Sequence, residues 1–169
     1  DFTDEMVDII ASRDNIMPYI HLPLQSGSDK ILKLMNRKYT SSEYLKLYNS
    51  IRSKVKNSSV TTDIIVGFPG ETEEDFQDTL KLVNECKFDG AFTFAYSPRE
   101  NTPAALMKDA IPEEVKMDRL HRLNEVINKY SNEANARMNG TIVKCLVTGL
   151  SDKDKSKVCG YTENMKLVN

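Results

Sequence analysis

The sequence predicts an α/β protein with a parallel sheet, followed by a short segment of β-strands. Up to about residue 139, segments with the spacing of amphipathic helices alternate with short apolar segments typical of strands. Such alternation is typical of right-handed βαβ units, in which successive strands run parallel. After Asn139-Gly140 the helical spacing stops and no further helix is expected. We therefore place a domain boundary near Asn139.

The first half of the chain supplies four predicted elements. They are a helix over residues 3–13, a strand over 18–24, a helix over 28–36 and a second helix that begins after residue 40. Met6, Ile9 and Ile10 share one face of the first helix. Thr40 and Glu43 have the spacing of a capping box, in which each side chain accepts a hydrogen bond from the backbone of the other residue. A helix should therefore start there.

Three further elements follow in the α/β part. Residues 61–67 form a nearly continuous apolar run, which predicts a buried strand of a parallel sheet. Thr72 and Asp75 form a weaker version of the capping box and predict another helix. Residues 91–96, which begin with a short apolar run, predict the next strand.

The last part of the chain combines a long helix with two strands. Pro112, followed by two glutamates, predicts the first turn of a helix that Asn139-Gly140 would end. Residues 141–149 and 157–168 predict two strands, joined by a polar stretch over 151–156. Two strands cannot bury a core alone. This second domain is therefore either truncated or leans on the first.

Charge is unevenly distributed between the two parts. Residues 1–136 carry 17 basic and 22 acidic side chains, whereas residues 137–169 carry 6 basic and 3 acidic ones. Residues 137–169 are thus net positive, whereas residues 1–136 are net negative. This difference indicates an anionic partner for residues 137–169. A solvated β-hairpin would carry a similar surplus of lysines, so this pattern leaves both interpretations open.

The composition excludes several classes of protein. Apolar residues make up 40% and charged residues 28% of the chain, a balance typical of a folded domain, and no segment approaches the ~20 apolar residues of a membrane helix.

The three cysteines, Cys86, Cys145 and Cys159, are widely spaced, which argues against disulfides or a zinc site and fits a reducing cytoplasm. We expect them to be small buried side chains. His21 is expected to face the interior of the sheet.

Three loops follow the predicted strands, and in parallel α/β sheets ligands bind at these strand ends. The loops cover residues 24–28, 67–72 and 96–103. All three would fall on the same edge of a parallel sheet, which predicts one shared pocket. Turns and helix caps alone also favour Gly, Pro and Ser in such loops. The loop over 67–72 is not a phosphate loop, because no Lys-Ser or Lys-Thr follows it.

Three sequence motifs carry a resemblance to a known family. They occur in order, each at a predicted strand end: HLPLQSGSDKILKLMNRKYT, TTDIIVGFPGETEEDF and FTFAYSPRENTPAA. On these motifs the chain resembles the methylthiotransferases of the radical SAM superfamily over essentially its whole length. Within that family it is most similar to the type that makes 2-methylthioadenosine in tRNA. The segment from about Met138 resembles the start of a TRAM domain, a small β-barrel that binds tRNA in this family.

The resemblance implies a fold and a chemistry. Residues 1–138 would be the C-terminal portion of a partial (β/α) barrel, and residues 139–169 the beginning of a truncated TRAM-like β domain. The whole protein would be a cytoplasmic enzyme that uses S-adenosylmethionine (SAM) and [4Fe–4S] clusters to add a methylthio group to an adenosine near the anticodon of tRNA.

The family holds its radical SAM cluster by a CxxxCxxC triplet, which this sequence lacks. No metal site and no cluster are therefore expected in this chain. A membrane partner is not expected either, because no long apolar segment is present. The missing N-terminal half of the same polypeptide would supply the cluster. The chain alone is expected to be inactive.

The resemblance also implies cofactor-binding residues. Gln25 matches a glutamine that contacts the SAM ribose, Asp63 an aspartate that accepts from the ribose hydroxyls, and Arg37 an arginine that pairs with the methionine carboxylate. Ser26 and Gly67 are further candidates from the neighbouring strand-end loops. The chemistry suits these ligands, because carboxylate and amide oxygens bind a diol and a guanidinium binds a carboxylate. Alternatively, Arg37 is only a cation at a helix C-terminus, and Asp63 pairs with a basic neighbour.

No catalytic residue is assigned. The candidate tRNA-binding residues are the lysines of the TRAM-like segment, Lys144, Lys153, Lys155, Lys157 and Lys166. Asp63 and Arg99 favour the tRNA enzymes over the sibling that modifies a ribosomal protein, although a sibling acting on another tRNA adenosine shares the aspartate. A non-catalytic RNA-binding fragment and a small-molecule α/β enzyme without a metal are the alternatives of other classes. The latter is disfavoured because no nucleophile–base pair is evident.

Overall fold

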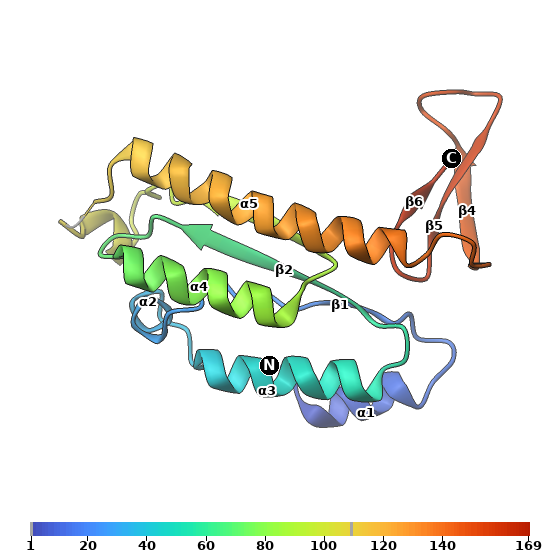
Figure 1. Cartoon of the computed structure of the whole chain (residues 1–169), viewed down its shortest axis with the longest axis horizontal. Coiled ribbons are helices and arrows are strands. Elements are labelled where there is room, and N and C mark those ends of the chain that lie inside the picture. The colour runs from blue at the N-terminus through green and yellow to red at the C-terminus, as the bar shows by residue number, and fades with distance from the viewer. Residues whose placement is uncertain (1, 109) are drawn as a thin grey trace.

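The computed structural model describes residues 2–108 and 110–169. Its elements are α1 (Asp4–Ala11), β1 (Tyr19–His21), α2 (Asp29–Leu34), α3 (Ser41–Lys54), β2 (Ser59–Val66), α4 (Glu73–Cys86), β3 (Gly90–Ala95), the 3-10 helix η1 (Pro103–Leu106), α5 (Glu113–Ala136), β4 (Cys145–Leu150), β5 (Val158–Thr162) and β6 (Leu167–Val168). Within these residues the strands form two separate three-stranded sheets, and helices pack against the first (Figure 1).

The first sheet has the order β1-β2-β3, and both strand pairs are parallel, as the alternation predicts. β1 is shorter than the strand predicted over 18–24. Its pairing with β2 ends at His21, and Pro23, which has no N–H to donate to a ladder, follows two residues later. The chain rejoins the sheet at Gln25, which forms an isolated parallel bridge with Ile64.

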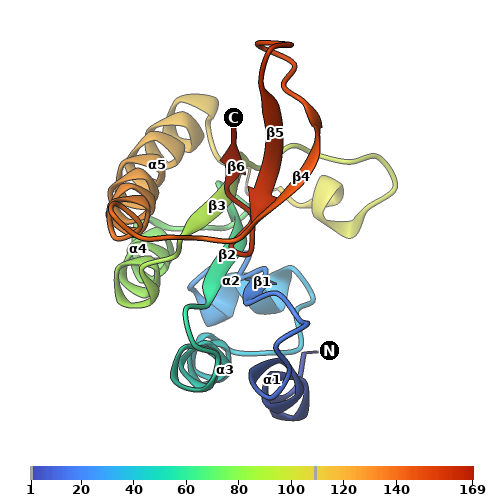
Figure 2. The same ribbon diagram turned by 90° about the vertical axis from the view of Figure 1, so that its right-hand side faces the viewer.

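The two faces of β2 have different surroundings. Val60, Ile64 and Val66 are fully buried, whereas Asp63 and Ile65 point to the other side and are half-buried. Helices α3, α4 and α5 cover the first face, and α1 lies beside α3 and adds Val7 to the core (Figure 2). The opposite face, which also carries the exposed rings of β3, is open. One side of the sheet thus forms the core and the other side is free for a site.

Both predicted capping boxes are confirmed. The Glu43 amide donates to Thr40 Oγ1 at 3.2 Å, and the Thr40 amide donates to Glu43 Oε2 at 2.8 Å. Thr72 and Asp75 form the same pair of bonds at the start of α4. These caps satisfy amides that a helix leaves free in its first turn, so α3 and α4 begin where the sequence predicts.

The second sheet has the antiparallel order β4-β5-β6. The single strand predicted over 157–168 is wrong, because a turn with Met165 at φ 57° splits it into β5 and β6. This sheet lies at the end of α5 opposite to the strand-end loops (Figure 1). Two hydrogen bonds join it to the first part of the chain: Asn164 donates to the Asn57 carbonyl at 2.8 Å, and Lys166 donates to the Asp89 carbonyl at 3.3 Å.

Among the described residues, no helix has the length and apolar character needed to pass through a bilayer.

The division of β2 into a core face and an open face predicts unequal effects of two neighbouring substitutions. Ile64→Ala should lower the free energy of unfolding by about 3 kcal/mol, because it leaves a cavity at a fully buried position. Ile65→Ala, on the open face, is the matched control and should cost about 1 kcal/mol. Urea unfolding of both variants measures the difference. Equal losses would contradict the assignment of the two faces.

Candidate functional site

A cavity of about 510 Å³ opens on the uncovered face of the first sheet, beside the C-terminal ends of β2 and β3. All three predicted strand-end loops contribute to it, through Gln25 from the first, Phe68 from the second and Tyr96 and Arg99 from the third. The parallel topology is the reason, because it brings the carboxyl ends of neighbouring strands to one edge. The shared pocket predicted from the sequence is therefore present.

Three of the five residues predicted to bind a cofactor meet in this cavity: Gln25, Arg37 and Asp63. Gln25 is fixed by backbone hydrogen bonds on both sides, since its amide donates to the Asp63 carbonyl at 2.8 Å and its carbonyl accepts from the Ile65 amide at 2.9 Å. Its φ of 69° lies in the left-handed region, which non-glycine residues rarely adopt. Such backbone strain is concentrated at functional sites.

Asp63 reaches the cavity because β2 alternates between its two faces. The side chain is 28% exposed, and its Oδ2 lies 3.2 Å from His21 Nε2. The expectation that His21 faces the interior of the sheet is therefore wrong. Ile20 takes the buried face of β1, so the next residue points to the open side.

Arg37 approaches the cavity from the loop after α2. The helix ends at Leu34, Asn36 adopts a left-handed conformation with φ 58°, and the Arg37 amide donates to the Leu32 carbonyl at 2.9 Å. Arg37 thus lies beyond the helix end and is not a cation of its last turn. Among the described residues no carboxylate lies within ion-pair distance of its guanidinium.

Ser26 and Gly67 do not line the cavity. Ser26 is buried toward α4, with its Oγ 3.3 Å from Thr79 Oγ1. Gly67 has φ 71°, a left-handed conformation that favours glycine, and a Cβ there would overlap the side chain of Lys116. Both residues shape loops of the site in this structure. Their predicted contact with a cofactor stays a prediction.

The loop over 67–72 is held by a buried ion pair that the sequence did not reveal. Arg119 on α5 lies 2.8 Å from Glu71 Oε2, and both residues are almost fully buried. Burial raises the pKa of Glu71, while the Gly67 amide and Arg119 oppose this shift. The two residues are 48 positions apart, and α5 shows no local pattern that sets this arginine apart from its neighbours.

Aromatic residues complete the cavity, and they were missed at the sequence level. The rings of Phe68 and Tyr96 meet edge to face, with centroids 5.0 Å apart, and the hydroxyl of Tyr96 is buried without a hydrogen-bond partner among the described residues. Phe94 lines the wall, and Phe92 lies on the same exposed face of β3. The two-residue spacing of Phe92 and Phe94 was the available signal, but it does not say which face of a strand is open.

The five lysines predicted to bind nucleic acid lie on the second sheet, away from the cavity. Three of them are near acidic side chains of the same sheet: Lys144 and Glu163 at 3.8 Å, Lys155 and Asp152 at 3.0 Å, Lys157 and Asp154 at 3.3 Å. Lys166 turns toward the first domain and donates to the carbonyl of Asp89. Lys153 belongs to the same loop as Lys155 and Lys157.

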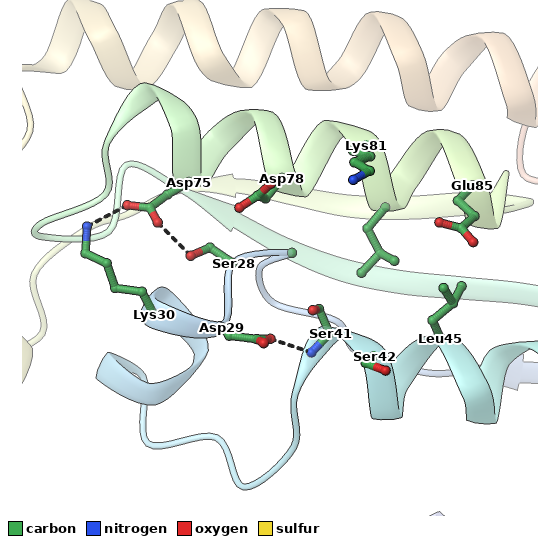
Figure 3. A pocket seen from close by; sticks show the side chains of 12 residues that line it. Ser28, Asp29, Lys30, Ser41, Ser42, Leu45, Asp75, Asp78, Lys81 and Glu85 are labelled. Atoms are coloured by element: carbon green, nitrogen blue, oxygen red, sulfur yellow. Dashed lines mark hydrogen bonds and ion pairs between the residues drawn. The ribbon is translucent and has the colours of Figure 1, made fainter.

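A second cleft, of about 500 Å³, lies on the outer surface between α2, α3 and α4 (Figure 3). Its charged groups pair with one another, since Asp75 accepts from Ser28 Oγ and from Lys30 Nζ, each at 2.7 Å. Asp29 accepts from the Ser41 amide at 2.6 Å. Burial raises the pKa of Asp75, but the bonds from Lys30, Thr72 and Ser28 outweigh it and lower this pKa to about 2. We interpret this cleft as a structural junction.

Within residues 2–108 and 110–169, no group of three potential metal ligands is gathered in one place. Cys86 is buried, as expected, and burial raises the pKa of its thiol to about 12. The expectation of burial is wrong for Cys145, which is exposed, and Cys159 is half-buried. Both lie on the second sheet, which has too few layers to bury them.

Comparison with known proteins supports a single family. Residues 1–83 match the model of the Radical SAM superfamily. The solved structure of coproporphyrinogen III oxidase from Escherichia coli, described as a radical SAM enzyme, is similar over 77% of this chain and 30% of that chain, with a TM-score of 0.64 and 23% identity. At this identity the likeness shows the fold, and it confirms the predicted α/β class.

Three curated relatives carry the same name, tRNA-2-methylthio-N(6)-dimethylallyladenosine synthase. They come from Oceanobacillus iheyensis, Staphylococcus haemolyticus and Bacillus cytotoxicus, and are 55%, 52% and 52% identical to this chain over all 169 residues. The chain covers 33% of each relative. It therefore spans about a third of the length of the curated relatives it matches.

The parallel sheet, with its cavity at the strand ends, is an α/β fold, and residues 1–83 of it match the Radical SAM superfamily. Over its full length, the chain is similar to the radical SAM methylthiotransferases. The resemblance found in the three sequence motifs is thereby confirmed.

The Asp75 junction predicts a pH-dependent contribution to stability. The pKa of this carboxyl is lower in the folded protein than its ordinary value, so the stabilisation is complete above about pH 4 and is lost as the pH falls toward 2. Asp75→Asn should lower the free energy of unfolding at pH 7 by about 2 kcal/mol, and the difference should shrink on acidification.

Urea unfolding at pH 7 and pH 3 measures this effect, with the exposed Asp78→Asn of the same cleft as control. A difference between wild type and Asp75→Asn that does not change with pH would contradict the assigned role of the ionised carboxylate.

Proposed function

We propose that this chain forms one wall of the SAM pocket of a radical SAM methylthiotransferase, and that the whole protein adds a methylthio group to an adenosine of tRNA. The observation that carries the proposal is the convergence of Gln25, Arg37 and Asp63 on one cavity. The volume of about 510 Å³ lies within the range of small-molecule sites. The names of the similar proteins supply the reaction and the substrate class.

Each of these side chains suits one part of SAM. The Asp63 carboxylate would accept hydrogen bonds from the ribose hydroxyls, and the Gln25 amide would bind the same diol beside it. The Arg37 guanidinium, which has no carboxylate partner among the described residues, would pair with the methionine carboxylate of SAM. Phe68 and Phe94 line the cavity and would exclude water from the nucleoside.

Together with SAM, a [4Fe–4S] cluster would supply the radical chemistry that insertion of a methylthio group requires. In this proposal the cluster is held by residues outside these 169 positions. The part played by this chain is to bind and orient the cofactor. A protein with tRNA as its substrate would act in the cytoplasm.

We further propose that the second sheet contacts the tRNA backbone. Three lysines of one loop, Lys153, Lys155 and Lys157, project from the end of this sheet together with two aspartates. Lys166 takes a different part, because it joins the sheet to the first domain. The net positive charge of residues 137–169 supports this surface over the acidic body.

Substitution of Asp63 tests the cofactor pocket. In the full-length protein, Asp63→Ala should weaken SAM binding by about tenfold to a hundredfold, because hydrogen bonds to a charged group are removed. Isothermal titration under anaerobic conditions measures the dissociation constant, and iron content shows that the cluster is retained. Asp78→Ala, a carboxylate of the outer cleft, is the control. An unchanged SAM affinity would show that Asp63 has only a structural role.

Salt dependence tests the RNA surface. Replacement of Lys153, Lys155 and Lys157 by Ala in the full-length protein should lower tRNA affinity, and should reduce the log–log salt slope by about 0.7 to 0.9 for each phosphate that the variant no longer neutralises. Filter binding at several salt concentrations measures the slope. The control replaces three exposed lysines of the helices, Lys46, Lys81 and Lys129. If the loop variant keeps the parental slope, tRNA binds elsewhere on the protein.

A further inference from the structure

A continuous line of polar contacts crosses the open face of the first sheet and ends at Asp63. The Tyr19 hydroxyl lies 3.0 Å from Thr61 Oγ1, and the same oxygen lies 3.0 Å from His21 Nδ1. The other ring nitrogen of His21 lies 3.2 Å from Asp63 Oδ2. Two residues of β1 and two of β2 thus form one chain of polar contacts.

The parallel register explains how these side chains meet. His21 is paired with Thr61, so Asp63 is its diagonal neighbour on the same face of the sheet, within reach of an imidazole ring. Tyr19 is paired with Ser59 and reaches Thr61 in the same diagonal way. The four side chains lie on one face because residues two apart in a strand point to the same side.

The hydroxyl and imidazole groups along this line can each act as donor or acceptor. When the Thr61 hydroxyl donates to His21 Nδ1, the ring N–H is on Nε2, which lies 3.2 Å from Asp63 Oδ2. The Tyr19 hydroxyl can then donate to Thr61 Oγ1. In this arrangement, Thr61 directs the N–H of His21 toward Asp63.

The ring of His21 is also held from the side. It meets the ring of Phe92 on β3 edge to face, with centroids 6.0 Å apart. The His21 side chain is 34% exposed. Its contacts with Thr61 and with the ring of Phe92 nevertheless limit its rotation. An ion pair that is fully exposed to solvent lacks such neighbours and contributes little to stability.

We propose that His21 is a positioning residue, which holds Oδ2 of Asp63 so that Oδ1 of the same carboxylate faces the ligand cavity. Among the described residues, no protein group donates to Oδ1. One carboxylate oxygen is thus occupied by the protein and the other is available for a ribose hydroxyl. This inference rests on the proposed role of Asp63 in binding SAM. It adds that the geometry of Asp63 is set by β1.

A double-mutant cycle in the full-length protein tests the inference through SAM affinity. His21→Ala should weaken SAM binding about tenfold, as expected when a carboxylate loses the polar contact that orients it. In the Asp63→Ala background the same substitution should have no further effect, because His21 acts only through Asp63. The measurements are anaerobic isothermal titrations with SAM, with iron content and the thermal midpoint of each variant as checks of folding.

Two conservative variants separate orientation from packing. His21→Gln keeps an N–H donor of similar reach and should retain SAM affinity within about threefold of wild type. Thr61→Val keeps the strand and its branched shape but removes the hydroxyl that directs the ring, and should weaken SAM binding by about threefold to fivefold. A role in packing alone would leave SAM affinity unchanged in Thr61→Val.

The outcomes distinguish failure of the inference from failure of the proposed function. If Asp63→Ala weakens SAM binding but His21→Ala does not, only the positioning role is wrong. If the loss caused by His21→Ala persists in the Asp63→Ala background, His21 acts by another route and the inference is overturned. If Asp63→Ala leaves the affinity unchanged, the proposed cofactor role of Asp63 fails, and the inference fails with it.

Discussion

The position of β2 between two parallel neighbours is the constraint on which the molecule depends. Because side chains alternate along a strand, Ile64 packs into the helical layer while Asp63 and Ile65 point to the open face. Pairing with β1 on one side and β3 on the other brings three strand-end loops to one edge. A slip of one residue in this register would bury the carboxylate and expose the core. Stability and the site are therefore set by the same pairing.

Residues far apart in the chain hold the loops of the site in place. The ion pair of Glu71 and Arg119 ties the loop after β2 to α5. A buried pair of this kind contributes more to a unique geometry than to net stability, because removing both charges from water is costly. Gln25 is held differently, by two backbone bonds to β2 in a conformation that costs energy. Both devices fix the backbone around the cavity and leave the side chains of Arg37 and Asp63 available.

Local patterns account for most elements of the fold. Capping residues and helical spacing located α3 and α4, and the alternation of elements predicted the parallel sheet and its shared pocket. Interactions between distant residues were beyond such patterns. The exposed position of His21 depends on which face of β1 the helices cover, and the partner of Glu71 lies on a helix 48 residues away. The turn at Met165 was missed because a left-handed methionine gives no signal comparable to glycine.

The joint between the two sheets has a consequence for local motion. The described contacts across it are made by polar groups, such as Asn164 to the Asn57 carbonyl and Lys166 to the Asp89 carbonyl. Water replaces bonds of this kind at little net cost. Leu146 and Leu150 of β4 stay exposed and add no apolar burial. The second sheet therefore opens at a lower free energy than the first, and its amide hydrogens exchange with solvent while those of β2 stay protected.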